Sequence, residues 1–101
     1  LPPAPATKLA LTPPEALRSP HYLRLDVKDE PGVLAKIASC TAKAGVSIAS
    51  LVQRPSEKPD AASLLLTTHE CSEAQIRRAV SRLSRLRCVL GKPLLLRIAD
   101  F

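Results

Sequence analysis

Residues 26–48 read DVKDEPGVLAKIASCTAKAGVSI, and this stretch decides the fold. Pro31 suits the first position of a helix, where its missing N–H would have no intrahelical partner in any case. Beyond Gly32, side chains recur at the spacing of one helical stripe, at Val33, Leu34, Ile37, Ala38 and Thr41. Gly45 can take the left-handed conformation in which helices often end. We therefore predict an amphipathic helix over residues 31–44.

The segment before this helix has the pattern of a strand. Over residues 21–27, apolar side chains alternate with polar ones, as expected of a strand with one buried face. The Pro-Gly pair at 31–32 therefore lies in a strand-to-helix turn. Asp29 or Glu30 is predicted to cap the helix that follows.

The rest of the chain supplies three more strands and a second helix. Ser72 followed by Gln75 is a capping-box signature, and the apolar spacing after it predicts a helix over residues 72–86. Runs rich in aliphatic and β-branched residues predict strands over residues 46–53, 63–69 and 93–98. Pro93 indicates that the last strand begins there or lies at an edge of the sheet. The charged segment RPSEKPDA at 54–61 is predicted to be a loop.

The order strand, helix, strand, strand, helix, strand predicts the α+β class. It is typical of a ferredoxin-like βαββαβ sandwich, in which a four-stranded antiparallel sheet carries both helices on one face. The other face is left open, and by alternation we expect it to carry Arg24, Ala49, Leu51, Leu65, Leu95 and Arg97. An open apolar face of this kind indicates a partner surface. A register shift of one residue would reverse the assignment of each side chain.

Composition divides the chain into two parts. Six of the ten prolines fall within residues 1–20, where apolar residues show no sustained period, so we expect a linker there and one domain over residues 21–101. The linker begins with Leu and lacks the segments of a signal peptide, so we expect a piece of a longer, cytoplasmic polypeptide. Three cysteines without C-x-x-C spacing fit a reducing compartment. No apolar run approaches the length of a membrane span, so we expect no membrane partner.

Several function classes are disfavoured. No nucleophile with a neighbouring base and orienting acid can be assembled, so we expect no catalytic residue. His69, Glu70 and Cys71 are consecutive at a strand end and point to alternating sides, so we expect no metal site. The net charge of +6 keeps an RNA-binding ferredoxin-like module as an alternative. However, RNA-binding sheets stack bases on aromatic side chains, and this chain has one Tyr and one Phe, so we expect no nucleic-acid partner.

The strand-to-helix turn has the chemistry of an anion site. A helix start carries unpaired N–H groups and a partial positive charge. Gly32 lacks the side chain that would keep an anion away, and we expect the N–H groups of Gly32, Val33 and Leu34 to point outward. A small carboxylate-bearing ligand would bind there with its ammonium group against Asp29. The alternative is that the turn only starts a helix.

Several motifs together resemble a known family. The chain has D-x-P-G-V-L-A-x-I-A at 29–38, G-V-S-I at 45–48, Gln53 closing the next strand, T-H-E at 68–70 and a closing R-I. It resembles an ACT domain, and specifically the C-terminal regulatory ACT domain of bacterial homoserine dehydrogenase. The first motif is common to ACT domains, whereas Y-L-R-L, S-I-x-x-x-x-Q, T-H and G-K-x-x-x-x-R-I together indicate homoserine dehydrogenase. The resemblance covers about residues 21–99.

The resemblance implies an allosteric module that is itself non-catalytic. The parent enzyme interconverts L-homoserine and L-aspartate 4-semialdehyde with NAD(P), in threonine, methionine and isoleucine biosynthesis. NAD(P) would bind the parent's catalytic part, since this chain has no G-x-G-x-x-G motif. ACT domains bind amino acids where two domains pair, which implies a homodimer, an L-threonine effector and a linker to the catalytic part. Carried over by position, the effector site comprises Asp29, Gly32, Val33, Leu34, Ser47, Ile48 and Gln53.

Two features bear on this resemblance. The amide of Gln53 offers both a donor and an acceptor, which suits a hydroxyl-bearing amino acid. The loop RPSEKPDA is shorter and less acidic than in many family members. The alternative within the same fold is an ACT domain of another enzyme, such as a nucleotide pyrophosphokinase or phosphoglycerate dehydrogenase.

Overall fold

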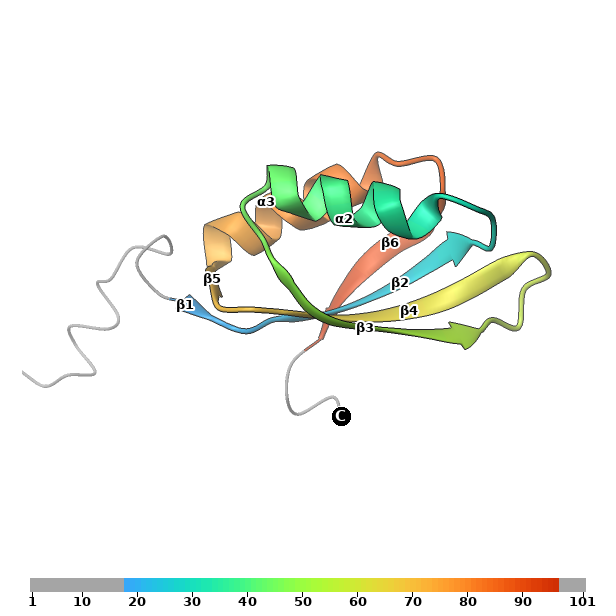
Figure 1. Ribbon diagram of the computed structural model, residues 1–101, viewed down its shortest axis with the longest axis horizontal. Coiled ribbons are helices and arrows are strands. Elements are labelled where there is room, and N and C mark those ends of the chain that lie inside the picture. The colour runs from blue at the N-terminus through green and yellow to red at the C-terminus, as the bar shows by residue number, and fades with distance from the viewer. Residues whose placement is uncertain (1–17, 97–101) are drawn as a thin grey trace, which may run out of the picture.

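The computed structural model describes residues 18–96, and these form two layers (Figure 1). In chain order the elements are β1 (Arg18–Ser19), β2 (Tyr22–Lys28), α2 (Val33–Lys43), β3 (Ile48–Pro55), β4 (Ala61–Thr68), β5 (Cys71–Ser72), α3 (Glu73–Ser84) and β6 (Val89–Leu96). The four long strands form an antiparallel sheet in the order β3-β4-β2-β6, with both helices on one face. This confirms the predicted ferredoxin-like sandwich. No helix within the described range is long and apolar enough to cross a membrane.

The hydrophobic core lies between the helices and the sheet. The two central strands, β2 and β4, place every second side chain in it, as the alternation in β2 predicted. The helices add Ile37 from α2 and Ile76 and Leu83 from α3, all fully buried. Burying one such side chain stabilises the fold by about 1.5–3 kcal/mol. The core therefore holds α2 at a fixed position over the sheet.

Helix α2 begins later than predicted, at Val33. Its N-cap is Gly32, whose φ of 85° is left-handed, and no side chain caps the helix. Pro31 therefore precedes the helix, and the predicted capping by Asp29 or Glu30 is wrong. Because the left-handed conformation is strained for residues with a Cβ, the backbone of this turn by itself accounts for a glycine.

Helix α3 begins with the predicted capping box. The backbone N–H of Gln75 donates to Ser72 Oγ at 3.1 Å, and the N–H of Ser72 donates to Gln75 Oε1 at 2.8 Å. The amide nitrogen of Gln75 also donates to the carbonyl oxygen of Gly45 at 3.2 Å. The start of α3 is therefore tied to the turn that follows α2.

A bulge in β3 changes which side chains reach the open face of the sheet. The register shifts between Ile48 and Ser50, so Ala49 lies within the irregularity. Beyond it, Leu51 pairs with Leu66 of the core face, and Val52 lies on the open face instead. The prediction that Leu51 points to the open face is therefore wrong.

The edge strand β6 contains a second irregularity. Its register against β2 shifts between Arg24 and Asp26, and Gly91 within β6 has a φ of 72°. Leu95 pairs with Leu23, so it lies on the helix-covered side, contrary to the prediction, and Leu94 lies on the open face opposite Arg24.

Two predicted members of the open face are confirmed. Arg24 on β2 and Leu65 on β4 pair with residues of that face. Arg97 lies outside the described residues. The last strand also starts earlier than predicted, but it does lie at an edge of the sheet, as Pro93 indicated.

A short ladder extends the domain at its N-terminal side. Arg18 and Ser19 of β1 pair with Ser72 and Cys71 of β5. The Arg18 guanidinium donates to the carbonyl oxygen of Glu70 at 2.9 Å, which holds this ladder against the start of α3. The predicted linker otherwise falls on residues 1–17, outside the described residues, so the domain boundary stays a prediction.

Candidate functional site

The turn between β2 and α2 is held by backbone hydrogen bonds on both sides. The N–H of Lys28 donates to the carbonyl oxygen of Cys88 at 2.8 Å, and that of Asp29 donates to the carbonyl oxygen of Asp60 at 2.9 Å. The carboxylate of Asp29 is exposed and has no hydrogen-bond or ion-pair partner within residues 18–96. It is therefore free to receive a cationic group of a ligand.

The start of α2 presents backbone donors. The N–H of Val33 reaches the carbonyl oxygen of Glu30 at 3.5 Å, and the N–H of Lys36 donates to the carbonyl oxygen of Gly32 at 3.1 Å. The N–H of Leu34 lies between these two and has no backbone acceptor among the described residues. A helix start with free N–H groups favours negative charge.

The three predicted residues of this helix start differ in exposure. Val33 is buried in the core, whereas Leu34 is 44% exposed. A Cβ on Gly32 would meet no atom within 4 Å, so the space in front of its backbone is open. The backbone of Gly32 is therefore accessible to a ligand, while the side chain of Val33 is not.

Asp29 and Gln53 line one depression of ≈ 500 Å³ at the end of β3. Three charged residues add to its lining, Arg54 near the end of β3 and Lys58 and Asp60 in the loop after it. The sequence predicted a charged loop over residues 54–61, but the structure places 54–55 in β3 and 61 in β4, so the loop is residues 56–60. Because charges of both signs meet here, the depression suits a ligand that carries both an ammonium and a carboxylate group.

Ser47 and Ile48 lie at the opposite end of the molecule from this depression. Ile48 pairs with Thr68, and the carbonyl oxygen of Ser47 accepts from the N–H of His69 at 2.9 Å. They follow the C-terminal end of α2, and Figure 1 shows that β3 runs back beneath the helix. A helix of 11 residues is about 16 Å long. Within one chain, the candidate residues therefore form two separate groups, one at each end of β3.

His21 and Cys71 form a contact that the sequence did not indicate. Nδ1 of His21 lies 3.4 Å from Sγ of Cys71, and Oγ1 of Thr68 accepts from the backbone N–H of His21 at 2.9 Å. Burial lowers the pKa of His21 below its usual value, and the backbone of Ser19 and the charge of Glu73 oppose this shift. The neutral imidazole is therefore part of the packing beside β5.

The fold and the helix start together match one protein family. The family model of the ACT domain matches residues 21–88. The chain belongs to the ACT domain family. The D-x-P-G-V-L motif on which the resemblance rested forms the turn and first residues of α2, next to the depression that Asp29 lines.

Homoserine dehydrogenases match this ACT domain in sequence and in structure, as the resemblance implied. The enzyme of Pseudomonas aeruginosa is 36% identical over 89 residues, which cover 87% of this chain and 20% of that protein. The crystal structure of the enzyme from Thiobacillus denitrificans superposes with a TM-score of 0.72 at 34% identity, covering 85% of this chain and 19% of that one. This chain thus spans about one fifth of the length of these relatives.

A further solved structure shows how widely the fold is shared. The ACT domain of a GTP pyrophosphokinase from Chlorobium tepidum has a TM-score of 0.63 at 15% identity. At that identity the likeness concerns the fold alone.

Proposed function

We propose that this chain is the amino-acid-binding regulatory domain of a homoserine dehydrogenase and that its effector is L-threonine. The parent would interconvert L-homoserine and L-aspartate 4-semialdehyde with NAD(P), and its catalytic part and cofactor site would lie outside this chain. The sequence identity to homoserine dehydrogenases supports this parent over other ACT-containing enzymes. The observation that carries the effector site is the placement of Asp29 and Gln53 in one depression, where Asp29 belongs to the turn that leads from β2 into α2.

Each group of the proposed effector has a complementary group at this site. The ligand's carboxylate would accept from backbone N–H groups at the start of α2, where the helix dipole favours negative charge. Its ammonium group would lie against the unpaired carboxylate of Asp29. Its hydroxyl would bond to the amide of Gln53, which can donate and accept. Hydrogen bonds to charged groups are the stronger ones, so the first two contacts would supply most of the affinity.

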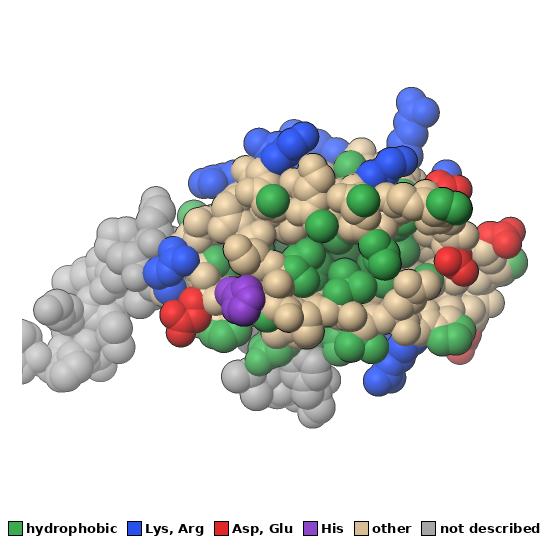
Figure 2. Space-filling model, in the orientation of Figure 1, with side chains coloured by type: hydrophobic (Ala, Val, Ile, Leu, Met, Phe, Trp, Pro, Cys, Tyr) green, Lys and Arg blue, Asp and Glu red, His purple; other side chains and the backbone are tan. Residues whose placement is uncertain are grey.

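The two separate groups of candidate residues support a paired site. Strand β3 lies at an edge of the sheet, so the outward backbone groups of this strand have no neighbouring strand in the described structure. If two subunits paired antiparallel along β3, the start of one strand would lie beside the end of the other. Ser47 and Ile48 of the partner subunit would then lie next to Gln53. Figure 2 shows a hollow lined by hydrophobic side chains between β3 and the helices, which such pairing would cover.

Titration calorimetry of the purified chain with L-threonine tests this proposal, together with its mass in solution by sedimentation. L-serine and L-isoleucine serve as comparison ligands. Serine keeps the hydroxyl of threonine but lacks its β-branch, and isoleucine keeps a β-branched side chain but lacks the hydroxyl. Threonine binding to a dimer, stronger than binding of either comparison, is the expected result. A folded chain that binds none of the three would overturn the effector role. A short single-stranded RNA in the same assay tests the alternative of an RNA-binding module.

The identity of the parent is tested separately with the full-length gene product. Homoserine-dependent reduction of NAD or NADP is the expected activity. Its absence, with threonine binding retained, would place the domain in another enzyme that uses the same fold.

A further inference from the structure

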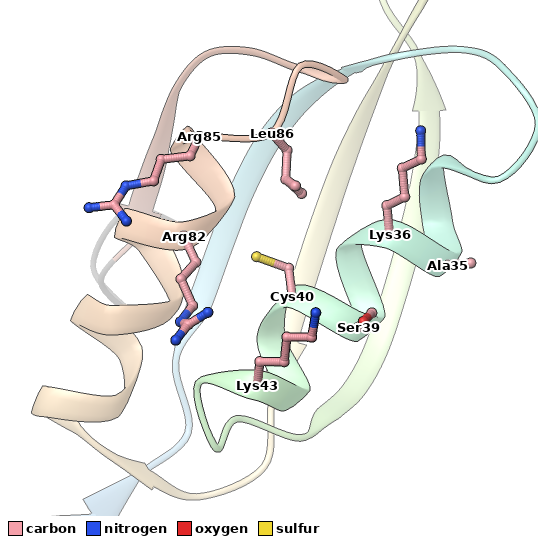
Figure 3. Close-up of a pocket in the computed structure, with 8 residues that line it drawn as sticks. All are labelled: Ala35, Lys36, Ser39, Cys40, Lys43, Arg82, Arg85 and Leu86. Atoms are coloured by element: carbon pink, nitrogen blue, oxygen red, sulfur yellow. The ribbon is translucent and has the colours of Figure 1, made fainter.

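A groove of ≈ 470 Å³ lies between α2 and α3, away from the candidate effector site. Figure 3 shows Cys40 and Leu86 pointing into the space between the helices. Cys40 is 8% exposed and Leu86 is partly buried, so the floor of this groove is apolar. The apolar side chains at the centre of this groove are therefore available for contact with another molecule.

The walls of the groove carry only positive charge. Lys36, Lys43, Arg82 and Arg85 line it, and no acidic residue of the described chain does. Figure 3 shows the Arg82 and Lys43 side chains in the space between the helices, whereas the Arg85 side chain points away from it. The single ion pair within residues 18–96 joins Arg77 to Glu73, outside the groove. Figure 2 shows basic side chains gathered along the helix layer. The four cations therefore lack a counter-charge from this domain.

The Cys40 thiol lies at the floor of the groove, among its positive charges. Burial raises the pKa of the Cys40 thiol, and the positive charges of Arg82 and Lys43 oppose that rise. Both cations also line the groove around this thiol.

The apolar floor and cationic walls limit which kind of molecule can bind in the groove. A second copy of the same face would set cations against cations, which opposes association. A nucleic acid backbone would satisfy the charge but leave the apolar floor uncovered, and no aromatic residue lines the groove for base stacking. A helix with an apolar stripe flanked by carboxylates satisfies both, because a third helix packs into the groove between two others.

We propose that the α2–α3 groove docks an acidic amphipathic helix of a protein partner. Apolar side chains of that helix cover Cys40 and Leu86, and its carboxylates pair with Lys36, Lys43 and Arg82, while Arg85 adds positive charge at the rim. The surface is distinct from the β3 edge, so it can be occupied while two ACT domains are paired.

Two fluorescent probe peptides test this docking surface by anisotropy. One is a helical peptide with a leucine stripe flanked by glutamates, and the other has the same composition with its leucines dispersed. Lys43→Glu/Arg82→Glu removes two cations of the groove. Arg78→Glu/Arg87→Glu makes the same change in net charge at exposed positions that do not line it. Circular dichroism establishes that both double variants are folded.

The striped peptide is expected to bind at least about tenfold more tightly than the dispersed one. The groove variant should weaken its binding by at least about tenfold, and the control variant by less than about threefold. Equal binding of both peptides, or equal loss in both variants, would mean general attraction to a basic surface and would overturn the proposal. Tighter binding of a single-stranded oligonucleotide, lost in the groove variant alone, would likewise overturn it in favour of a nucleic-acid surface.

Discussion

The side chain of Gln75 joins two elements, because its Nε2 donates to the carbonyl oxygen of Gly45 while its Oε1 accepts from the N–H of Ser72. One residue therefore caps α3 and fixes the turn that leads from α2 into β3. Gln75→Ala removes both bonds, together with a longer one of 3.4 Å that Oε1 accepts from the Arg18 guanidinium. We expect a loss of about 1–2 kcal/mol in the free energy of unfolding. Gln75→Glu keeps the bond from Ser72 but sets a carboxylate against a carbonyl oxygen, so it should also be destabilising. Urea denaturation measures both, and a Gln75→Ala variant as stable as the parent would show that these side-chain bonds contribute nothing.

Gln53→Ala should weaken threonine binding by about tenfold, since one hydrogen bond to the ligand is lost in a partly desolvated site. Ser50→Ala is the matched control, because Ser50 lies on the same strand but pairs with Thr67 on the open face. Calorimetry of both variants distinguishes the two faces of β3. An unchanged affinity in Gln53→Ala would remove this residue from the proposed site.

The bulge in β3 determines which of two neighbouring residues, Leu51 or Val52, tolerates a charged substitution. Leu51 packs against the core, so Leu51→Asp would place a charge there and should cost about 2–4 kcal/mol. Val52 is 44% exposed on the open face, so Val52→Asp should cost less than about 1 kcal/mol. Thermal and urea unfolding provide the comparison. A reversed order of the two losses would mean that the strand keeps the uninterrupted alternation expected from its sequence.

Acid should weaken the fold through His21. Because burial lowers its pKa in the folded state, the unfolded chain binds a proton more readily. The stabilising effect of the neutral imidazole is complete above the unfolded pKa of about 6.5 and is lost as the pH falls through the lower, folded value. The loss of stability between pH 7.5 and 5.5 should therefore be smaller in His21→Gln than in the parent. Identical losses in urea midpoint would exclude His21 as the titrating group.

Sequence patterns between near neighbours predicted the helices and strands. They did not predict the register shifts between paired strands. The capping box of Ser72 and Gln75 involves neighbours in the chain, so its residues alone predict it. The shifts beside Ile48 and within β6 depend on which strands lie opposite, and strict alternation therefore misplaced Leu51 and Leu95. The start of α2 was misplaced because Gly32 takes a left-handed turn that the Pro-Gly pair does not specify.

The candidate site was accessible to sequence reasoning only in part. The helix start follows from the pattern around Gly32, but Gln53 came from the family resemblance. Its position beside Asp29, and the separation of both from Ser47, depend on how β3 crosses beneath α2. The groove between α2 and α3 likewise depends on helix packing, although the basic composition of the second helix gave a hint of its charge.

The irregular backbone of β6 has a consequence for assembly. The two edges of the sheet differ. In β3 the only proline is Pro55, the last residue of the strand. In β6, Gly91 has a left-handed φ and Pro93 has no backbone N–H to donate. A strand can extend the first edge, but the second offers a broken row of backbone groups. Growth by strand addition would therefore stop once two subunits had joined. If the proposed pairing along β3 forms, it would give a closed pair and not a fibre.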